Sequence, residues 1–123
     1  MDIKIHFRDY TVEARLHDTP TARAVYESIP IESTVNTWGD EIYFHIPVSY
    51  DLEKGSKAEV EVGDLAYWPT MPAFCIFFGP TPASSGSQPV AASAVNVFGR
   101  LLETDIPSLQ SVGSGEPVRI TKG

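Results

Sequence analysis

Cysteine is nearly absent from this sequence: Cys75 is the only one, so no disulfide can form within the chain. Basic residues are also few, because nine lysines and arginines stand against 16 aspartates and glutamates and give a formal net charge of −7. Nucleic acids and anionic membranes bind clusters of basic residues, and the sequence has no such cluster. We therefore expect neither of them as a partner.

Long hydrophobic runs are missing too. The N-terminal stretch MDIKIHFRDY alternates charged and apolar residues, which is unlike a signal peptide or a membrane-spanning segment. We therefore expect a cytoplasmic protein. Its 123 residues, 42% of them hydrophobic, suffice for one domain over 1–123 with a single apolar core.

The common patterns of catalytic and metal sites are absent from the sequence as well. His6, His17 and His45 lie far apart, and no pair of histidines or cysteines has zinc-ligand spacing, so we expect no metal and no other cofactor. There is no G-x-S-x-G pattern and no glycine-rich loop before a helix. Cys75 lies between apolar residues, which favours a buried and inert thiol. No catalytic residue can be assigned from these patterns.

Most of the sequence instead has the pattern of β-strands. Apolar and polar residues alternate in 3–7 and 10–16 and predict a first hairpin, and residues 31–47 predict a second one that turns at Gly39-Asp40. Within the second hairpin, Ile42, Phe44 and Ile46 share one face of the strand, while Glu41, Tyr43 and His45 share the other. A short helical turn is expected within 104–112. Further strands are expected at 58–62, 65–69, 74–78, 94–102 and 117–121.

One segment, 20–29, has the period of an α-helix. Pro20 suits the first helical turn, and Pro30 ends the helix. The apolar stripe of this helix consists of Ala22, Val25, Tyr26 and Ile29. Many short strands with one helix predict a mainly β protein, in which a closed barrel or a sandwich is plugged at one end by the helix.

The stretch FCIFFGPTPASSGSQP, which begins at Phe74, has apolar residues on both faces of its strand. Phe74, Ile76 and Phe78 share one face, while Cys75 and Phe77 share the other. In a barrel only one of these faces can point into the core. The other face is therefore covered by another part of the fold or lines a groove for a ligand, and the sequence leaves both possibilities open.

Four motifs, NTWGDEIYF, GDLAYWP, FCIFFGPTPAS and NVFGRL, resemble in order and spacing those of the small bacterial and archaeal cyclophilin-like proteins. The resemblance spans nearly the whole chain and implies a closed eight-stranded β-barrel, capped at one end by the helix at about 20–29. Cyclophilins isomerise X-Pro peptide bonds in an outer groove with an aromatic floor and an arginine. Where they read Phe-His-Arg, this chain reads Phe44-His45-Ile46, so the arginine is missing.

We therefore predict a module that binds a proline-containing peptide or a small apolar molecule in an outer aromatic groove. Two alternatives stay open: a weak peptidyl-prolyl isomerase without the usual arginine, and a homodimeric interaction protein whose apolar face forms the interface. For the phenylalanines of the groove, a place in the core is equally open. The expected groove residues are Tyr43, His45, Trp68, Phe74, Phe78, Thr81 and Phe98.

Overall fold

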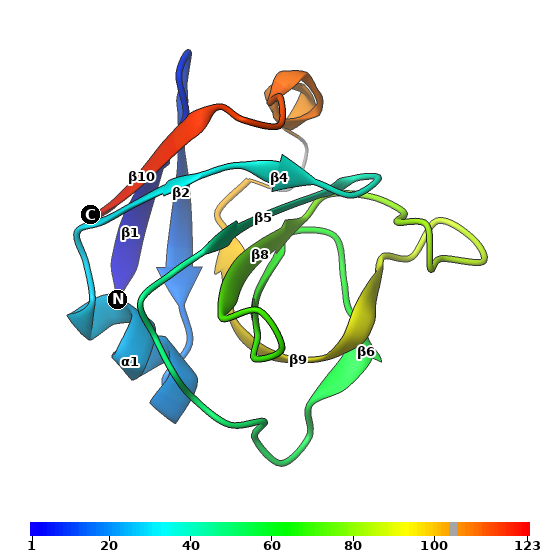
Figure 1. The fold of residues 1–123 in the computed structure, drawn as a ribbon, viewed down its shortest axis with the longest axis horizontal. Helices are drawn as coiled ribbons and strands as arrows, with labels where there is room; N and C mark the ends of the chain where they lie inside the picture. Colours follow the sequence, from blue (N-terminus) through cyan, green and yellow to red (C-terminus); the bar gives the residue numbers. More distant parts are fainter. Residues whose placement is uncertain (104–105) are drawn as a thin grey trace.

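β-strands are the predominant regular elements of the computed structural model, which describes residues 1–103 and 106–123 (Figure 1). The helical elements are α1 (Pro20–Glu27) and the short 3-10 helix η1 (Pro107–Ser111). Among the described residues, no helix is long and apolar enough to cross a membrane. The strands are β1 (Asp2–His6), β2 (Thr11–Leu16), β3 (Ile31–Thr34), β4 (Asn36–Thr37), β5 (Glu41–His45), β6 (Lys57–Glu59), β7 (Asp64–Trp68), β8 (Ala73–Phe77), β9 (Val90–Leu101) and β10 (Pro117–Lys122).

The helix predicted at 20–29 is confirmed, although α1 ends at Glu27. Its start follows from the sequence, because the Thr19 hydroxyl accepts a hydrogen bond from the Ala22 amide at 3.1 Å and a proline occupies the first turn. The helical turn expected within 104–112 corresponds to η1. Residues 104 and 105 of that expected segment lie outside the described residues.

The strands form one sheet of ten, in the order β3-β10-β1-β2-β9-β7-β8-β5-β4, and β6 pairs with β9 beside this path. The mainly β class with one α-helix is confirmed, but the expectation of a closed eight-stranded barrel is wrong. In the described chain, β3 and β4 end the path without pairing with each other. Val35 separates them, and its amide and carbonyl bond to Glu116 and Gly115, before β10. The strand expected around 31–38 is thus divided between the two edges, which leaves the sheet open.

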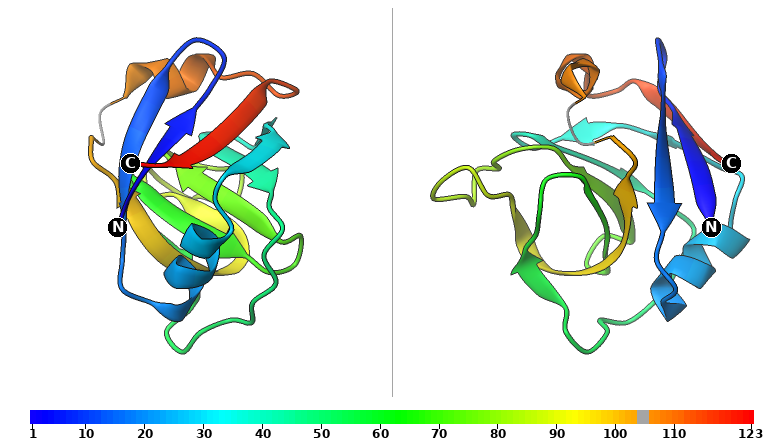
Figure 2. Two further views of the ribbon diagram at one scale, coloured as in Figure 1. Left: turned by 90° about the vertical axis from the view of Figure 1, so that its left-hand side faces the viewer. Right: turned by 180° about the vertical axis from the view of Figure 1, so that it is seen from behind.

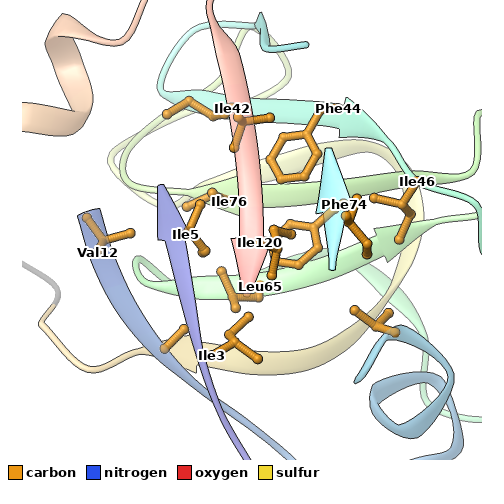
Figure 3. Close-up of a cluster of buried hydrophobic side chains, with 14 of the residues drawn as sticks. Ile3, Ile5, Val12, Ile42, Phe44, Ile46, Leu65, Phe74, Ile76 and Ile120 are labelled. Atoms are coloured by element: carbon orange, nitrogen blue, oxygen red, sulfur yellow. The ribbon is translucent and has the colours of Figure 1, made fainter. Parts of the chain in front are cut away.

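The main hydrophobic core lies between β1, β2 and β10 on one side and β5, β7 and β8 on the other, with α1 at one end (Figure 1). Figure 3 shows side chains from these strands gathered in this core. The ring of Phe74 stacks on Phe44 with centroids 5.0 Å apart and meets Phe98 edge-on at 5.1 Å. Such pairs add about 0.5–1.5 kcal/mol to the stability gained by burial alone. The neighbouring strands β5, β8 and β7 form a wall, here called the β5–β8–β7 wall. One face of this wall is covered by the main core.

The other face of this wall packs into a second, smaller cluster. Strand β9 makes the cluster possible: its 12 residues pair with β2 and β7 toward one end and with β6 toward the other. The strand therefore curves around the outer side of β8, as Figure 1 shows and Figure 2 repeats from behind. The buried residues of the second cluster are Val60, Ala66, Ala73, Cys75, Phe77, Ala91 and Val95. The second face of the strand at 74–78 is thus covered largely by β9.

A buried polar contact attaches β9 to the rest of the fold. The side-chain nitrogen of Asn96, a residue only 3% exposed, donates to the Thr21 hydroxyl at 3.1 Å and to the Asp51 carbonyl at 2.9 Å. The side-chain oxygen of Asn96 accepts a hydrogen bond from the Glu53 amide at 2.8 Å. These contacts connect the middle of β9 to the start of α1 and to the loop between β5 and β6.

Candidate functional site

A cavity of about 220 Å³ opens in the second cluster, on the outer face of β5 and β8. Its lining comes from the hairpin between β4 and β5, from β5, β7 and β8, and from the first half of β9. Three aromatic side chains, small apolar side chains, a thiol and one carboxyl group surround this space. The lining residues are Trp38, Glu41, Tyr43, Trp68, Cys75, Ala91, Ala92 and Val95.

Trp38 and Glu41 are held opposite each other by a tight turn. The Trp38 amide donates to the Glu41 carbonyl at 3.0 Å, and the Glu41 amide donates back to the Trp38 carbonyl at 3.2 Å. Between them, Gly39 has a φ of 59°, which glycine adopts without steric cost. A β-carbon at Gly39 would also lie 2.9 Å from the Cα atom of Thr81. The turn therefore requires glycine, and it brings both flanking side chains to the same cavity.

Strand alternation brings the other aromatic residues to this face. Tyr43 lies opposite Cys75 across the β5–β8 ladder, and Cys75 lies opposite Ala66 across the β7–β8 ladder. Trp68 follows Ala66 at the next position of the same parity on β7, so it faces the same side. The indole nitrogen of Trp68 donates to the Ser93 hydroxyl of β9 at 2.7 Å. The sheet thus forms one continuous wall of the cavity.

Glu41 is the only carboxyl group in the described lining, and the residue is 6% exposed. Burial raises the pKa of Glu41 from 4.5 to about 7, because the charged form loses its hydration, while the neighbouring Cys75 thiol acts in the opposite direction. Burial also raises the pKa of Cys75 well above its usual value, and the nearby Glu41 carboxyl adds to this effect. Near neutral pH the cavity therefore holds a protonated thiol and a carboxyl group that is only partly ionised.

The lining supplies no basic partner for this carboxyl group, since it contains no lysine, arginine or histidine among the described residues. Within residues 1–103 and 106–123, no group of three His, Cys, Asp or Glu side chains could hold a metal ion. The described residues form three ion pairs: Arg15–Asp2, Arg23–Asp18 and Arg100–Asp64. Glu41 takes part in none of them.

Of the seven expected groove residues, Tyr43 and Trp68 line the cavity. Phe74 and Phe98 are instead fully buried in the main core, because β8 and β9 direct these side chains inward. Phe78 is half-buried and packs against the same core. The structure therefore places all three phenylalanines on the side of the wall that faces away from the cavity.

The two remaining candidates also lie outside the lining. His45 is exposed at the end of β5. Thr81 is buried, but its hydroxyl donates to the Val90 carbonyl and its amide donates to the Ser84 hydroxyl at 2.9 Å. Thr81 thus holds the loop that follows β8.

Sequence reasoning missed Trp38, Glu41 and the small residues of β9. For Glu41 a signal was available, because side-chain alternation along the strand places it on the same face as Tyr43, which was among the expected groove residues. The residues of β9 gave no signal, because they reach the cavity only through the curvature of a long strand. Cys75 is buried as predicted, yet it also forms part of the lining.

The family model described as cyclophilin-like matches residues 1–121, and the chain therefore belongs to the cyclophilin-like family. Among solved structures, the hypothetical protein AF2241 from Archaeoglobus fulgidus is 41% identical with a TM-score of 0.84, and the match covers 100% of this chain and 95% of that one. McbB, solved in complex with tryptophan, is 17% identical with a TM-score of 0.71 over 98% of this chain and 44% of McbB, a likeness of fold alone. None of the curated proteins matches the chain.

Proposed function

We propose that the protein binds a small organic molecule in the cavity bounded by β5, β7, β8 and β9. The observation that carries this proposal is the lining, in which two tryptophans, a tyrosine and a buried carboxyl group surround one largely apolar space. Small-molecule sites are typically concave, lined by apolar and aromatic side chains, and equipped with a few polar groups that orient the ligand. The cavity has each of these properties.

The size of the cavity favours a small molecule over an extended peptide. Sites for drug-sized ligands measure roughly 300–1,000 Å³, whereas this cavity measures about 220 Å³. A molecule with one ring and a short substituent suits such a space.

The lining supports binding without isomerisation. Catalysis of X-Pro rotation requires a donor that matches the twisted amide better than either planar isomer. No arginine belongs to the described lining. Arg100 lies near the other end of β9 from the lining residues, where it donates to Asp64 at 2.7 Å and to the Val62 carbonyl at 3.0 Å.

The intrinsic fluorescence of the protein provides the test. Its two tryptophans, Trp38 and Trp68, both line the cavity, so their emission reports on its occupancy. A library of one-ring and two-ring compounds, titrated into the protein, is expected to contain ligands that shift this emission. Ala92 is an exposed residue of the lining, so Ala92→Phe should fill the cavity and weaken binding about tenfold or more, a loss of ~1.4 kcal/mol.

Ala83→Phe is the matched control, because Ala83 is exposed in the loop after β8 and lies outside the lining. This variant should bind the same ligands with unchanged affinity. The proposal fails if no compound binds, or if Ala92→Phe and Ala83→Phe affect binding equally.

A further inference from the structure

The lining also indicates the chemical class of the ligand. Building on the small-molecule site proposed above, we infer that the cavity binds an organic cation, an amine or ammonium whose charged nitrogen lies beside Glu41. The apolar part of this ligand would lie against the three aromatic side chains of the lining.

The carboxyl group of Glu41 lacks a basic partner among the described residues. A carboxylate removed from water is normally paired with a cation or bound by several donors. Glu41 is 6% exposed and belongs to none of the ion pairs formed by residues 1–103 and 106–123. The neighbouring Cys75 thiol is only a weak donor. A cationic ligand would therefore neutralise Glu41 where the fold itself leaves the acid without a basic partner.

The aromatic side chains of the lining also favour a cation. The faces of tryptophan and tyrosine rings are negatively polarised and attract ammonium groups that lie within about 6 Å of the ring centre. Trp38, Tyr43 and Trp68 line the same cavity as Glu41. The indole nitrogen of Trp68 already donates to Ser93, so Trp68 offers a ligand its ring and not its N–H group. The aromatic rings and the carboxylate of Glu41 thus both favour a positively charged ligand.

Anionic and neutral ligands fit the charge of the lining less well. An anion would meet Glu41 without any lysine, arginine or histidine from the described lining. A neutral molecule of the same shape could fill the cavity but would leave the buried carboxylate uncompensated. The formal net charge of −7 further favours the approach of cations. Cations should therefore bind best and anions worst.

Cation binding should also be coupled to the proton on Glu41. Burial raises the pKa of this group to about 7, so a cation that arrives at pH 6 must displace a proton, while at pH 8 the carboxylate is already formed. The other titratable groups around Glu41 are Asp40 in the turn, Tyr43 on β5 and Cys75 on β8. The lining residues from β7 and β9 carry no titratable side chain. We expect the affinity for a cation to rise about tenfold from pH 6 to pH 8.

Three one-ring probes of similar size test the inference: benzylamine as the cation, benzyl alcohol as the neutral analogue and benzoate as the anion. Each is titrated into the full chain at pH 8 while tryptophan emission is followed. Benzylamine is expected to bind about ten to a hundred times more tightly than benzyl alcohol, and benzoate should bind most weakly. Glu41→Gln keeps the shape of the side chain and removes its charge. It should lower the affinity for benzylamine to about that for benzyl alcohol, and so remove the preference for the cation.

The outcomes separate this inference from the proposed function. Equal affinities for benzylamine and benzyl alcohol would overturn the cation inference but leave the small-molecule site in place. Failure of all three probes would also overturn it, whereas the proposed function is tested separately by the compound library and by the Ala92→Phe and Ala83→Phe variants. The pH series uses the wild-type chain alone, so it tests Glu41 even if the variant does not fold. A benzylamine affinity that stays constant from pH 6 to pH 8 would contradict the role of this carboxyl group.

Discussion

Glu41 sets both the charge and the pH response of the cavity. The fold removes its carboxyl group from water, and in the described chain no lysine or arginine compensates for this loss. The charged form of the group is therefore disfavoured in the native state. Since Glu41 is the only carboxyl group of the described lining, a single substitution tests this effect.

We expect Glu41→Gln to stabilise the protein at alkaline pH. The pKa of Glu41 is raised from 4.5 to about 7, so between these values the native state binds more protons than the unfolded chain. The free energy of unfolding of the wild type therefore falls as the pH rises from 4.5 through about 7. The total loss caused by Glu41 is on the order of 3 kcal/mol. The difference in free energy of unfolding between Glu41→Gln and the wild type should therefore grow by roughly this amount in favour of the variant from pH 4.5 to pH 8.5. Urea unfolding at the two pH values measures it.

The matched control for this experiment is Glu59→Gln, which alters an exposed carboxyl group on β6. It should keep the pH dependence of the wild type. If Glu41→Gln also keeps that dependence, the carboxyl group of Glu41 is ionised at no greater cost in the native state than in the unfolded chain.

Single residues also show what strand alternation can predict. It correctly separated Phe74 and Phe44 from Tyr43 and Cys75, because neighbouring side chains on a strand point to opposite faces. It could not decide which face of β8 borders the main core. That choice depends on the strands packed against each face, so Phe74 was expected in the groove with the same weight as in the core.

At the scale of elements, the hairpin between β4 and β5 positions two lining residues at once. Its turn has glycine at the first central position, with a φ of 59°, where other residues are strained. The sequence Gly39-Asp40 predicted this turn correctly. The contact between the turn and the loop after β8 was not predictable, since it joins segments that are distant in the chain.

We expect Gly39→Ala to destabilise the protein by roughly 2–4 kcal/mol and to weaken ligand binding. The strained φ costs about 1–3 kcal/mol, and the new β-carbon would lie 2.9 Å from backbone and side-chain atoms of Thr81 and Pro82. Gly55→Ala is the control, because Gly55 has a φ of 92° and a β-carbon added there would have no atom within 4 Å. It should show only the cost of the strained φ, about 1–3 kcal/mol, without the added steric clash, and leave binding intact. Chemical denaturation and fluorescence titration measure the two effects, and equal losses in both variants would contradict the steric argument.

Strand β9 is the element that sequence patterns described least well. Its alternation predicted a strand over 94–102, whereas the strand spans Val90–Leu101. The added residues at its start include Ala91 and Ala92, which form one wall of the cavity. Small residues carry little hydrophobic periodicity, so neither the early start of the strand nor its curvature was visible in the pattern.

At the scale of the whole molecule, the β5–β8–β7 wall serves two hydrophobic clusters. Strand β9 connects the same two regions, and Asn96 attaches it to the start of α1. Neither cluster can therefore open fully without exposing apolar residues of the other. This shared wall makes cooperative unfolding the expected behaviour.

We expect the protein to unfold in one transition. Both tryptophans line the cavity in the second cluster, so their fluorescence reports on that region, while far-ultraviolet circular dichroism reports on all strands. The two signals should give the same urea midpoint. Phe77→Ala, at a fully buried position of the second cluster, should lower both midpoints together by an amount equivalent to about 3–5 kcal/mol. A fluorescence change that precedes the loss of circular dichroism would show that the two clusters unfold separately.

By itself, the sequence determined the local elements, the family and the faces that residues of one strand share. These properties depend on neighbours along the chain, on turn residues such as Gly39 and on the alternation of side chains. Tertiary structure alone decided that the sheet stays open at β3 and β4 and that β9 curves over the outer face of β8. It also brought Glu41 and Trp38 to the small residues of β9. The cavity depends on long-range register and strand curvature, and neither is specified by the periodicity of any single segment.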